Sequence, residues 1–176
     1  RLIFASRNTL GICFLACTIA LFIGTIFGII AAIDRSYIDQ ILSRSIDTLM
    51  AIPVMIFTFI LLSVFGPSNL NLILILGVLE STRFFRISRS VAVGQVVLEY
   101  VEVAKLRGEK LSYIIFREIL PNIASPLIVE FGVRFIFIIF TVSSLSFLGL
   151  GIQPPAADWA AMVRENAILI QYAQYD

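Results

Sequence analysis

Histidine is absent from this sequence, and charged residues make up only 14% of it. Without histidine, the chain cannot use an imidazole as a general base or build the common histidine metal sites. The net charge at pH 7 is +1, so charge gives no reason to expect nucleic-acid binding. No Gly-x-x-x-x-Gly-Lys-Ser/Thr phosphate loop occurs, which excludes ATP hydrolysis by that route within this chain.

Cysteine is also scarce, because Cys13 and Cys17 are the only two. Their spacing of four places both on one face of a helix. No further candidate ligand lies near them in the sequence, so two small apolar packing residues are the simplest interpretation. We therefore predict no metal site and infer no disulfide.

Apolar residues are abundant instead, since 59% of the 176 residues are hydrophobic. A soluble domain of this length cannot hide so much apolar surface, so we predict a polytopic membrane protein. Residues 8–33 carry no charge and can cross a hydrocarbon core of about 30 Å as a helix that rises about 1.5 Å per residue. Within this stretch, Gly24 and Gly28 form a small-xxx-small pair suited to close contact with another helix.

We predict an all-α transmembrane helix bundle that forms one domain over residues 1–176. Its four spans are expected at about 9–33, 48–65, 70–89 and 122–149. Pro53 should kink the second span, where neighbouring helices can absorb the bend. The third span must continue through Glu80 and Arg83, because its uncharged part, residues 70–79, is too short to cross the bilayer alone. We interpret the chain as an internal piece of a longer protein.

One charged segment, at about residues 90–121, interrupts the apolar sequence. Together with the end of the preceding span it contains these basic residues: Arg83, Arg86, Arg89, Lys105, Arg107, Lys110 and Arg117. Cytoplasmic loops are enriched in Lys and Arg, so we predict that this segment lies in the cytoplasm and the turn at 66–69 outside. Residues 99–107 favour a short surface helix that Gly108 would end, followed by a second helix. Ala104 would let a cytoplasmic partner approach closely.

The order of residues in this segment is similar to a known motif. Glu102, Ala104 and Gly108, followed by Leu120 and Pro121, have the spacing of the EAA motif and so resemble the binding-protein-dependent ABC importer permeases. In that family the motif marks a cytoplasmic coupling loop whose short helix sits in a groove of a separate ATPase subunit. The resemblance assigns coupling to six residues: Glu102, Val103, Ala104, Gly108, Leu120 and Pro121.

A second patch narrows the resemblance to one branch. The sequence LSFLGLGIQPP at 145–155, followed by Trp159 and Met162, resembles the C-type subunit of the dipeptide, oligopeptide and nickel permeases. The sequence GPSNLN at 66–71 fits the same branch, as does the pair Arg86 and Arg89. Three residues depart from the usual pattern, namely Val103 for Ala, Glu118 for a frequent His, and Ala160 for Gly.

The resemblance implies a fold like that of the type I ABC importer permeases and a non-catalytic subunit of an ATP-driven importer. It implies a second permease subunit (expected to make a heterodimer), two ATPase subunits that bind the ATP, and an external solute-binding protein. This chain would hold no cofactor itself and would bind lipid but no nucleic acid. It would lie in the cytoplasmic membrane of a bacterium or archaeon and carry a peptide, nickel or a similar small solute. A first span with its external loop and a last span would lie outside this chain.

Two charges stand in the middle of the predicted fourth span. Glu130 and Arg134 lie about 12 and 18 Å along a helix that begins near residue 122. A lone charge at that depth costs at least about 2.5–3.5 kcal/mol on insertion scales, so both side chains should face the bundle interior or water. Their spacing of four with Glu first favours an ion pair.

The pair is open to two interpretations, a border of the translocation pathway together with Glu80 and Arg83, or a buried contact that fixes helix packing. It also supports an alternative function, an ion-gradient-driven secondary transporter that uses Glu130 and Arg134. That alternative does not explain the spacing from Glu102 to Pro121. A membrane-embedded enzyme is disfavoured, because no histidine, acidic cluster or motif-bearing Ser or Cys is present.

Overall fold

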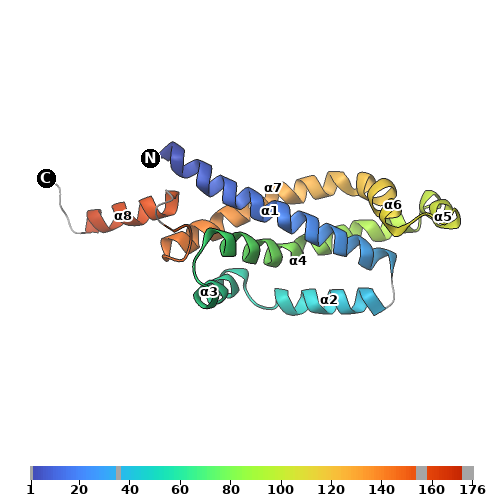
Figure 1. Cartoon of the computed structure of the whole chain (residues 1–176), viewed down its shortest axis with the longest axis horizontal. Coiled ribbons are helices and arrows are strands. Elements are labelled where there is room, and N and C mark those ends of the chain that lie inside the picture. Colours follow the sequence, from blue (N-terminus) through green and yellow to red (C-terminus); the bar gives the residue numbers. More distant parts are fainter. Residues whose placement is uncertain (1, 35–36, 154–157, 172–176) are drawn as a thin grey trace.

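The computed structural model describes residues 2–34, 37–153 and 158–171, and every regular element within these residues is a helix (Figure 1). The elements are α1 (Leu2–Ile33), α2 (Tyr37–Met50), α3 (Val54–Phe65), α4 (Asn69–Val96), α5 (Glu99–Leu106), α6 (Leu111–Tyr113), the π-helix η1 (Ile114–Ile119), α7 (Leu120–Phe147) and α8 (Trp159–Gln171). The predicted all-α helix bundle is confirmed.

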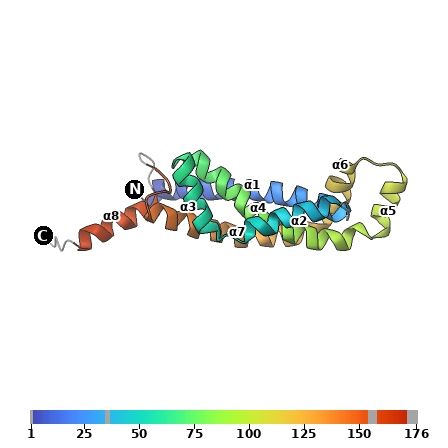
Figure 2. The ribbon, with the colours of Figure 1, turned by 90° about the horizontal axis from the view of Figure 1, so that it is seen from below.

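Three long helices, α1, α4 and α7, lie side by side and form the body of the bundle (Figures 1 and 2). The contact between α1 and α4 uses the predicted glycine pair. A Cβ on Gly24 would collide with the carbonyl of Ser81, and one on Gly28 would collide with the hydroxyl of Ser88. Only hydrogen at these positions lets the two backbones come this close.

The larger of two buried clusters lies in the half of the bundle away from α5 and consists mainly of small and branched side chains from α1, α3, α4 and α7, with Phe84 among them. Cys13 and Cys17 are both fully buried in it as free thiols, which agrees with the packing interpretation. No group of three or more candidate metal ligands occurs among the described residues.

The region predicted as one span at 48–65, kinked at Pro53, contains the end of α2 and all of α3, with a sharp turn between them. That this region forms one span stays a prediction. The helices α2 and α3 meet at an angle of 86° around Pro53. Proline has no N–H to continue the hydrogen bonds of α2, so the chain turns instead of bending slightly. The polar residues before this turn belong to α2, which lies along the bundle (Figure 1).

Ion pairs attach α2 to α4. Arg89 binds both carboxylate oxygens of Asp39 at 2.5 and 2.6 Å, and Arg86 is 2.5 Å from a carboxylate oxygen of Asp47. Asp39 and Asp47 are eight residues apart and therefore share a face of α2. The two arginines thus hold a neighbouring helix.

The last two predicted spans also have different bounds. Helix α4 passes through Glu80 and Arg83 as expected but continues to Val96. The final long helix runs without interruption over Leu111–Phe147, so it begins well before the predicted residue 122. By length and composition, this helix and α1 are each able to cross a membrane, and the bent pair of α2 and α3 forms a third candidate.

Candidate functional site

The motif-bearing segment forms the end of the molecule that lies opposite α8 and the start of α1 (Figure 1). Helix α5 ends at Leu106, and Gly108 then adopts a φ of +74°. This left-handed conformation is strained for residues with a Cβ but open to glycine. The N–H of Glu109 closes the turn by donating to the carbonyl of Ala104 at 3.2 Å. The predicted helix and its glycine end are confirmed.

Helix α5 has a packed face and an exposed face. Val101 and Ala104 are fully buried where α5 packs on η1 and α4. On the other face, Val103 is 49% exposed and Leu106 is 81% exposed, and Glu102 is exposed beside them. Our expectation that Ala104 admits an outside partner therefore needs correction, because its small side chain admits the helices of its own chain.

A polar chain fixes the start of α5 to its neighbours. The hydroxyl of Tyr100 donates to Oε1 of Gln95 at 2.7 Å and accepts from Nδ2 of Asn122 at 3.3 Å. Burial raises the pKa of the Tyr100 phenol. This contact joins α4, α5 and α7 at one point. It was not predicted from the sequence, although a Tyr and an Asn beside the motif are candidates for such a role.

The motif residues Leu120 and Pro121 follow a wide helical turn, the π-helix η1. The π-helix η1 places the N–H of Leu120 on the carbonyl of Ile115. A proline ring clashes with the carbonyl four residues earlier in an α-helix, here that of Arg117, and a π-turn relieves this clash. Nδ2 of Asn122 donates to the carbonyl of Glu118 at 2.7 Å. The helix therefore passes Pro121 intact and connects the motif rigidly to α7.

A second group of predicted residues meets between α4 and α7. Nε of Arg134 donates to Oε1 of Glu130 at 2.6 Å, and Nη1 of Arg134 lies 4.0 Å from Oε2 of Glu80. The Glu80, Glu130 and Arg134 side chains are 6%, 15% and 20% exposed. These three residues form the ion cluster of the bundle. Arg83 is partly buried one turn further along α4, and the ion pair of Glu80 is with Arg134 of the neighbouring helix instead.

Aromatic and thiol groups surround the ion cluster. The guanidinium of Arg134 lies over the ring of Phe137, 5.0 Å from its centroid, in a cation–π contact. The thiol of Cys17 on α1 lies 3.7 Å from the carbonyl of Phe131. The sequence did not identify Phe137, because a phenylalanine in an apolar span carries no signal of its own.

At the other end of the bundle, the LSFLGLG sequence forms a tight turn. Gly149 has a φ of +92°, and a Cβ on Gly151 would collide with Ser146, whose hydroxyl accepts a hydrogen bond from the N–H of Ile152 at 3.1 Å. Residues 154–157, which include both prolines of the predicted motif, lie outside the described residues.

Asp158 then joins the chain back to α1. Its carboxylate is 1% exposed, accepts from the hydroxyl of Thr9 at 2.8 Å, and accepts from the N–H of Ala161 at 3.1 Å. The indole N–H of Trp159 donates to the carbonyl of Leu2 at 3.1 Å. Asp158 was not predicted as a functional residue, although an Asp directly before a helix is a common cap.

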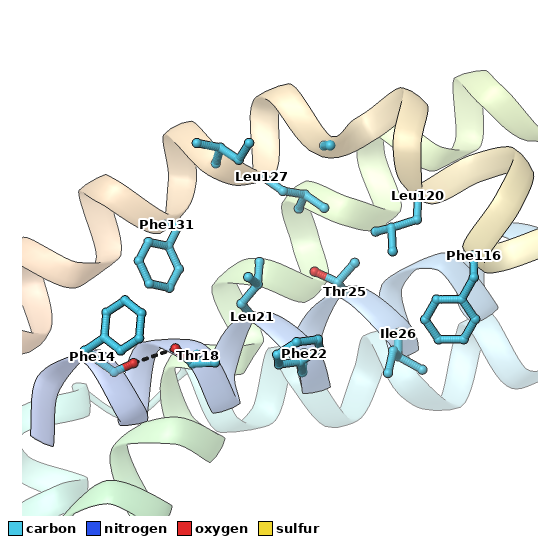
Figure 3. Close-up of a pocket in the computed structure, with 12 residues that line it drawn as sticks. Phe14, Thr18, Leu21, Phe22, Thr25, Ile26, Phe116, Leu120, Leu127 and Phe131 are labelled. Atoms are coloured by element: carbon cyan, nitrogen blue, oxygen red, sulfur yellow. Dashed lines mark hydrogen bonds between the residues drawn. The ribbon is translucent and has the colours of Figure 1, made fainter. Parts of the chain in front are cut away.

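A cavity of about 470 Å³ lies between α1 and the final long helix (Figure 3). Its lining is apolar and includes Phe14, Phe131 and Phe116 (Figure 3). Thr25 is its notable polar member, since its buried hydroxyl has no hydrogen-bond partner among the described residues.

The comparisons with known proteins agree with this arrangement. Residues 24–173 match the model of the family described as "Binding-protein-dependent transport system inner membrane component", and the chain belongs to this family of membrane proteins. The predicted resemblance is therefore confirmed.

Curated relatives belong to the predicted branch. The chain is 33% identical over 175 residues to the dipeptide transport system permease protein DppC of Alkalihalophilus pseudofirmus, covering 99% of this chain and 58% of the relative. It is 32% identical over 165 residues to the glutathione transport system permease protein GsiD of Pectobacterium atrosepticum, covering 94% of this chain and 55% of that protein. The chain thus spans a little over half the length of these relatives.

The fold is also similar to a solved structure. A chain in the crystal structure of an amino acid ABC transporter with histidines superposes with a TM-score of 0.60 at 20% identity. The match covers 96% of this chain and 76% of that chain. At this level of identity the likeness supports the fold alone.

Proposed function

We propose that this chain is the core of a permease subunit in an ATP-driven importer, and that α5 couples it to a separate ATPase subunit in the cytoplasm. Family membership supports the first part. The coupling role of α5 is supported by its exposed face at one end of the bundle. A glycine turn and the continuous helix Leu111–Phe147 follow α5 and connect it to the bundle.

The shape of this end suits a coupling element. Val103 and Leu106 offer an apolar contact, and the charged Glu102 and Lys105 beside them can set its register. A displacement of α5 would be passed to α7 through its buried face and through the Tyr100–Asn122 contact. Glu102 and Val103 would thus touch the ATPase, while Ala104, Gly108, Leu120 and Pro121 would position them.

The ion cluster would border the solute pathway. A second permease subunit would complete this pathway, and an external binding protein would deliver the solute. Because the relatives are named for dipeptide and glutathione transport, we propose a peptide as the solute. Two partner ATPase subunits would bind and hydrolyse the ATP.

Co-purification tests this function. The full-length protein that contains this chain is used as bait in detergent, as wild type and as the variants Val103→Arg and Val163→Arg. Val163 on α8 is a matched control, because it is also an exposed valine, 61% against 49%, but lies at the other end of the bundle.

We expect an ATPase subunit to accompany the wild type and Val163→Arg, and to be lost from Val103→Arg. Loss of the ATPase from neither variant would contradict the role of α5. Absence of any ATPase from the wild type would contradict the proposed importer itself.

A further inference from the structure

Glu80 has a carboxylate oxygen that nothing in the described residues satisfies. Glu80 is only 5% exposed, and its Oε2 atom is fully buried and accepts no hydrogen bond from the described residues. Its nearest cation is Nη1 of Arg134 at 4.0 Å, which is too long for a hydrogen bond. A buried carboxylate oxygen without a donor is costly, so this oxygen marks a site where a donor is missing.

The charges around this oxygen favour a cation as the missing donor. Two carboxylates, Glu80 and Glu130, share the guanidinium of Arg134, which bonds to Glu130 at 2.6 Å and lies over the ring of Phe137. Arg134 is therefore engaged on its own helix and leaves Glu80 on α4 incompletely paired. Arg83, one turn along α4, adds positive charge near Glu80, but the ion pair of Glu80 among the described residues is with Arg134.

The cluster is open on one side. Phe137 is 52% exposed, and the Glu130 and Arg134 side chains keep 15% and 20% of their surface. The exposed fraction falls from 52% at Phe137 to 20% at Arg134 and 6% at Glu80, so Glu80 is the least accessible of the three. A rotation of the Arg134 side chain would make Glu80 accessible to a ligand. Arg134 could keep its ion pair with Glu130 during this rotation, because Glu130 lies one turn away on the same helix.

We propose that Glu80 binds a cationic N–H donor, the ammonium group of the transported solute, while the solute passes the ion cluster. This inference rests on the proposed importer function and adds a chemical requirement to it. An ammonium group supplies both the donor and the charge that Oε2 lacks. A neutral amide supplies a weaker donor and no charge, so the site discriminates against it.

Direct binding to the purified, complete transporter in lipid nanodiscs tests the inference without the external binding protein. The probes are alanyl-alanine amide, which carries only an ammonium group, and N-acetyl-alanyl-alanine amide, which is neutral. We expect the wild type to bind the ammonium probe about tenfold or more tightly than the neutral one, as one charge-assisted hydrogen bond predicts.

Three variants sharpen the result. Glu80→Gln should reduce affinity for the ammonium probe about tenfold or more, and Glu165→Gln, an exposed control on α8, should leave it unchanged. Glu130→Gln should also weaken binding, because it releases Arg134 to pair with Glu80. A cluster that served packing alone would give none of these differences.

Equal binding of the two probes by the wild type would overturn the inference, and so would unchanged binding by an assembled Glu80→Gln transporter. The comparison of probes on the wild type decides the question even if Glu80→Gln fails to assemble. Peptide uptake by wild-type proteoliposomes, measured in parallel with the binding protein, distinguishes failure of this inference from failure of the proposed function. Uptake without preference for ammonium contradicts this inference alone, whereas absence of uptake contradicts the proposed function.

Discussion

Two charged regions interrupt this apolar chain, and they treat their charges in opposite ways. At the end of the bundle, α5 exposes Glu102 and Lys105 and buries only Val101 and Ala104. Between α4 and α7, the ion cluster buries Glu80 almost completely. In the first region, buried apolar residues anchor a helix whose charged side chains lie in solvent. In the second region, the charge of Arg134 pairs with two carboxylates that are largely removed from solvent. We propose a partner surface at the first region and a site for a small ligand at the second.

The largest effect is expected at the ion cluster. Arg134→Gln leaves Glu80 and Glu130 in the bundle without their shared cation, and the loss of one member of a buried ion pair costs about 3–5 kcal/mol. We expect a corresponding fall in the free energy of unfolding, measured by denaturant titration in detergent. The double variant Arg134→Gln with Glu130→Gln should recover part of this loss. Equal stability of wild type and Arg134→Gln would mean that the cluster is already solvated.

A smaller loss of stability is expected when a larger side chain is introduced on the buried face of α5. Ala104→Phe forces a large side chain into a fully buried position, and overpacking costs about 1–3 kcal/mol. Faster proteolysis of the segment around α5 would report this loss. The neighbouring Val103→Phe on the exposed face is the control and should be cleaved at the wild-type rate. The reverse order would show that the two faces of α5 have been exchanged.

A substitution in the glycine turn after α5 should lower the stability somewhat less than Ala104→Phe does. Gly108→Ala places a Cβ on a residue with a φ of +74°, where it costs roughly 1 kcal/mol. The site around Gly108 is open, so strain and not collision is the cause. Gly94→Ala is a suitable control, because its site in α4 is also open but without a positive φ. We expect lower thermal stability for Gly108→Ala but not for Gly94→Ala. Higher thermal stability of Gly108→Ala would contradict the claim that a Cβ is strained at this position.

An effect of similar size to that of Gly108→Ala is expected from Tyr100→Phe, which removes one hydroxyl that bonds to Gln95 and Asn122. A hydrogen bond of this kind contributes about 0.5–1.5 kcal/mol. Hydrogen exchange of the α5 amides should accelerate, while α1 should exchange as in the wild type. No change in α5 would show that its buried face alone fixes its position.

Local patterns predicted the first region well. The helix at 99–106, its end at Gly108 and the close contact at Gly24 and Gly28 all depend on spacings of a few residues, which a sequence displays directly. The i, i+4 pair of Glu130 and Arg134 was predicted for the same reason.

Features that depend on contacts between distant residues were missed or wrong. The face of α5 that Ala104 occupies is packed against η1 and α4, and α2 is attached to α4 through Arg86 and Arg89, far along the sequence. Asp158 reaches Thr9 across most of the sequence. None of these partners can be identified from a spacing.

The orientation of α5 is the central claim, and cysteine accessibility tests it most directly. Val103→Cys and Ala104→Cys are compared in the full-length protein with a maleimide added from the cytoplasmic side; the native Cys13 and Cys17 are fully buried and give little background. Our account predicts that Val103→Cys reacts and is protected when the ATPase is present, whereas Ala104→Cys stays unreacted in both conditions. Reaction and protection at Ala104→Cys, with none at Val103→Cys, would contradict it.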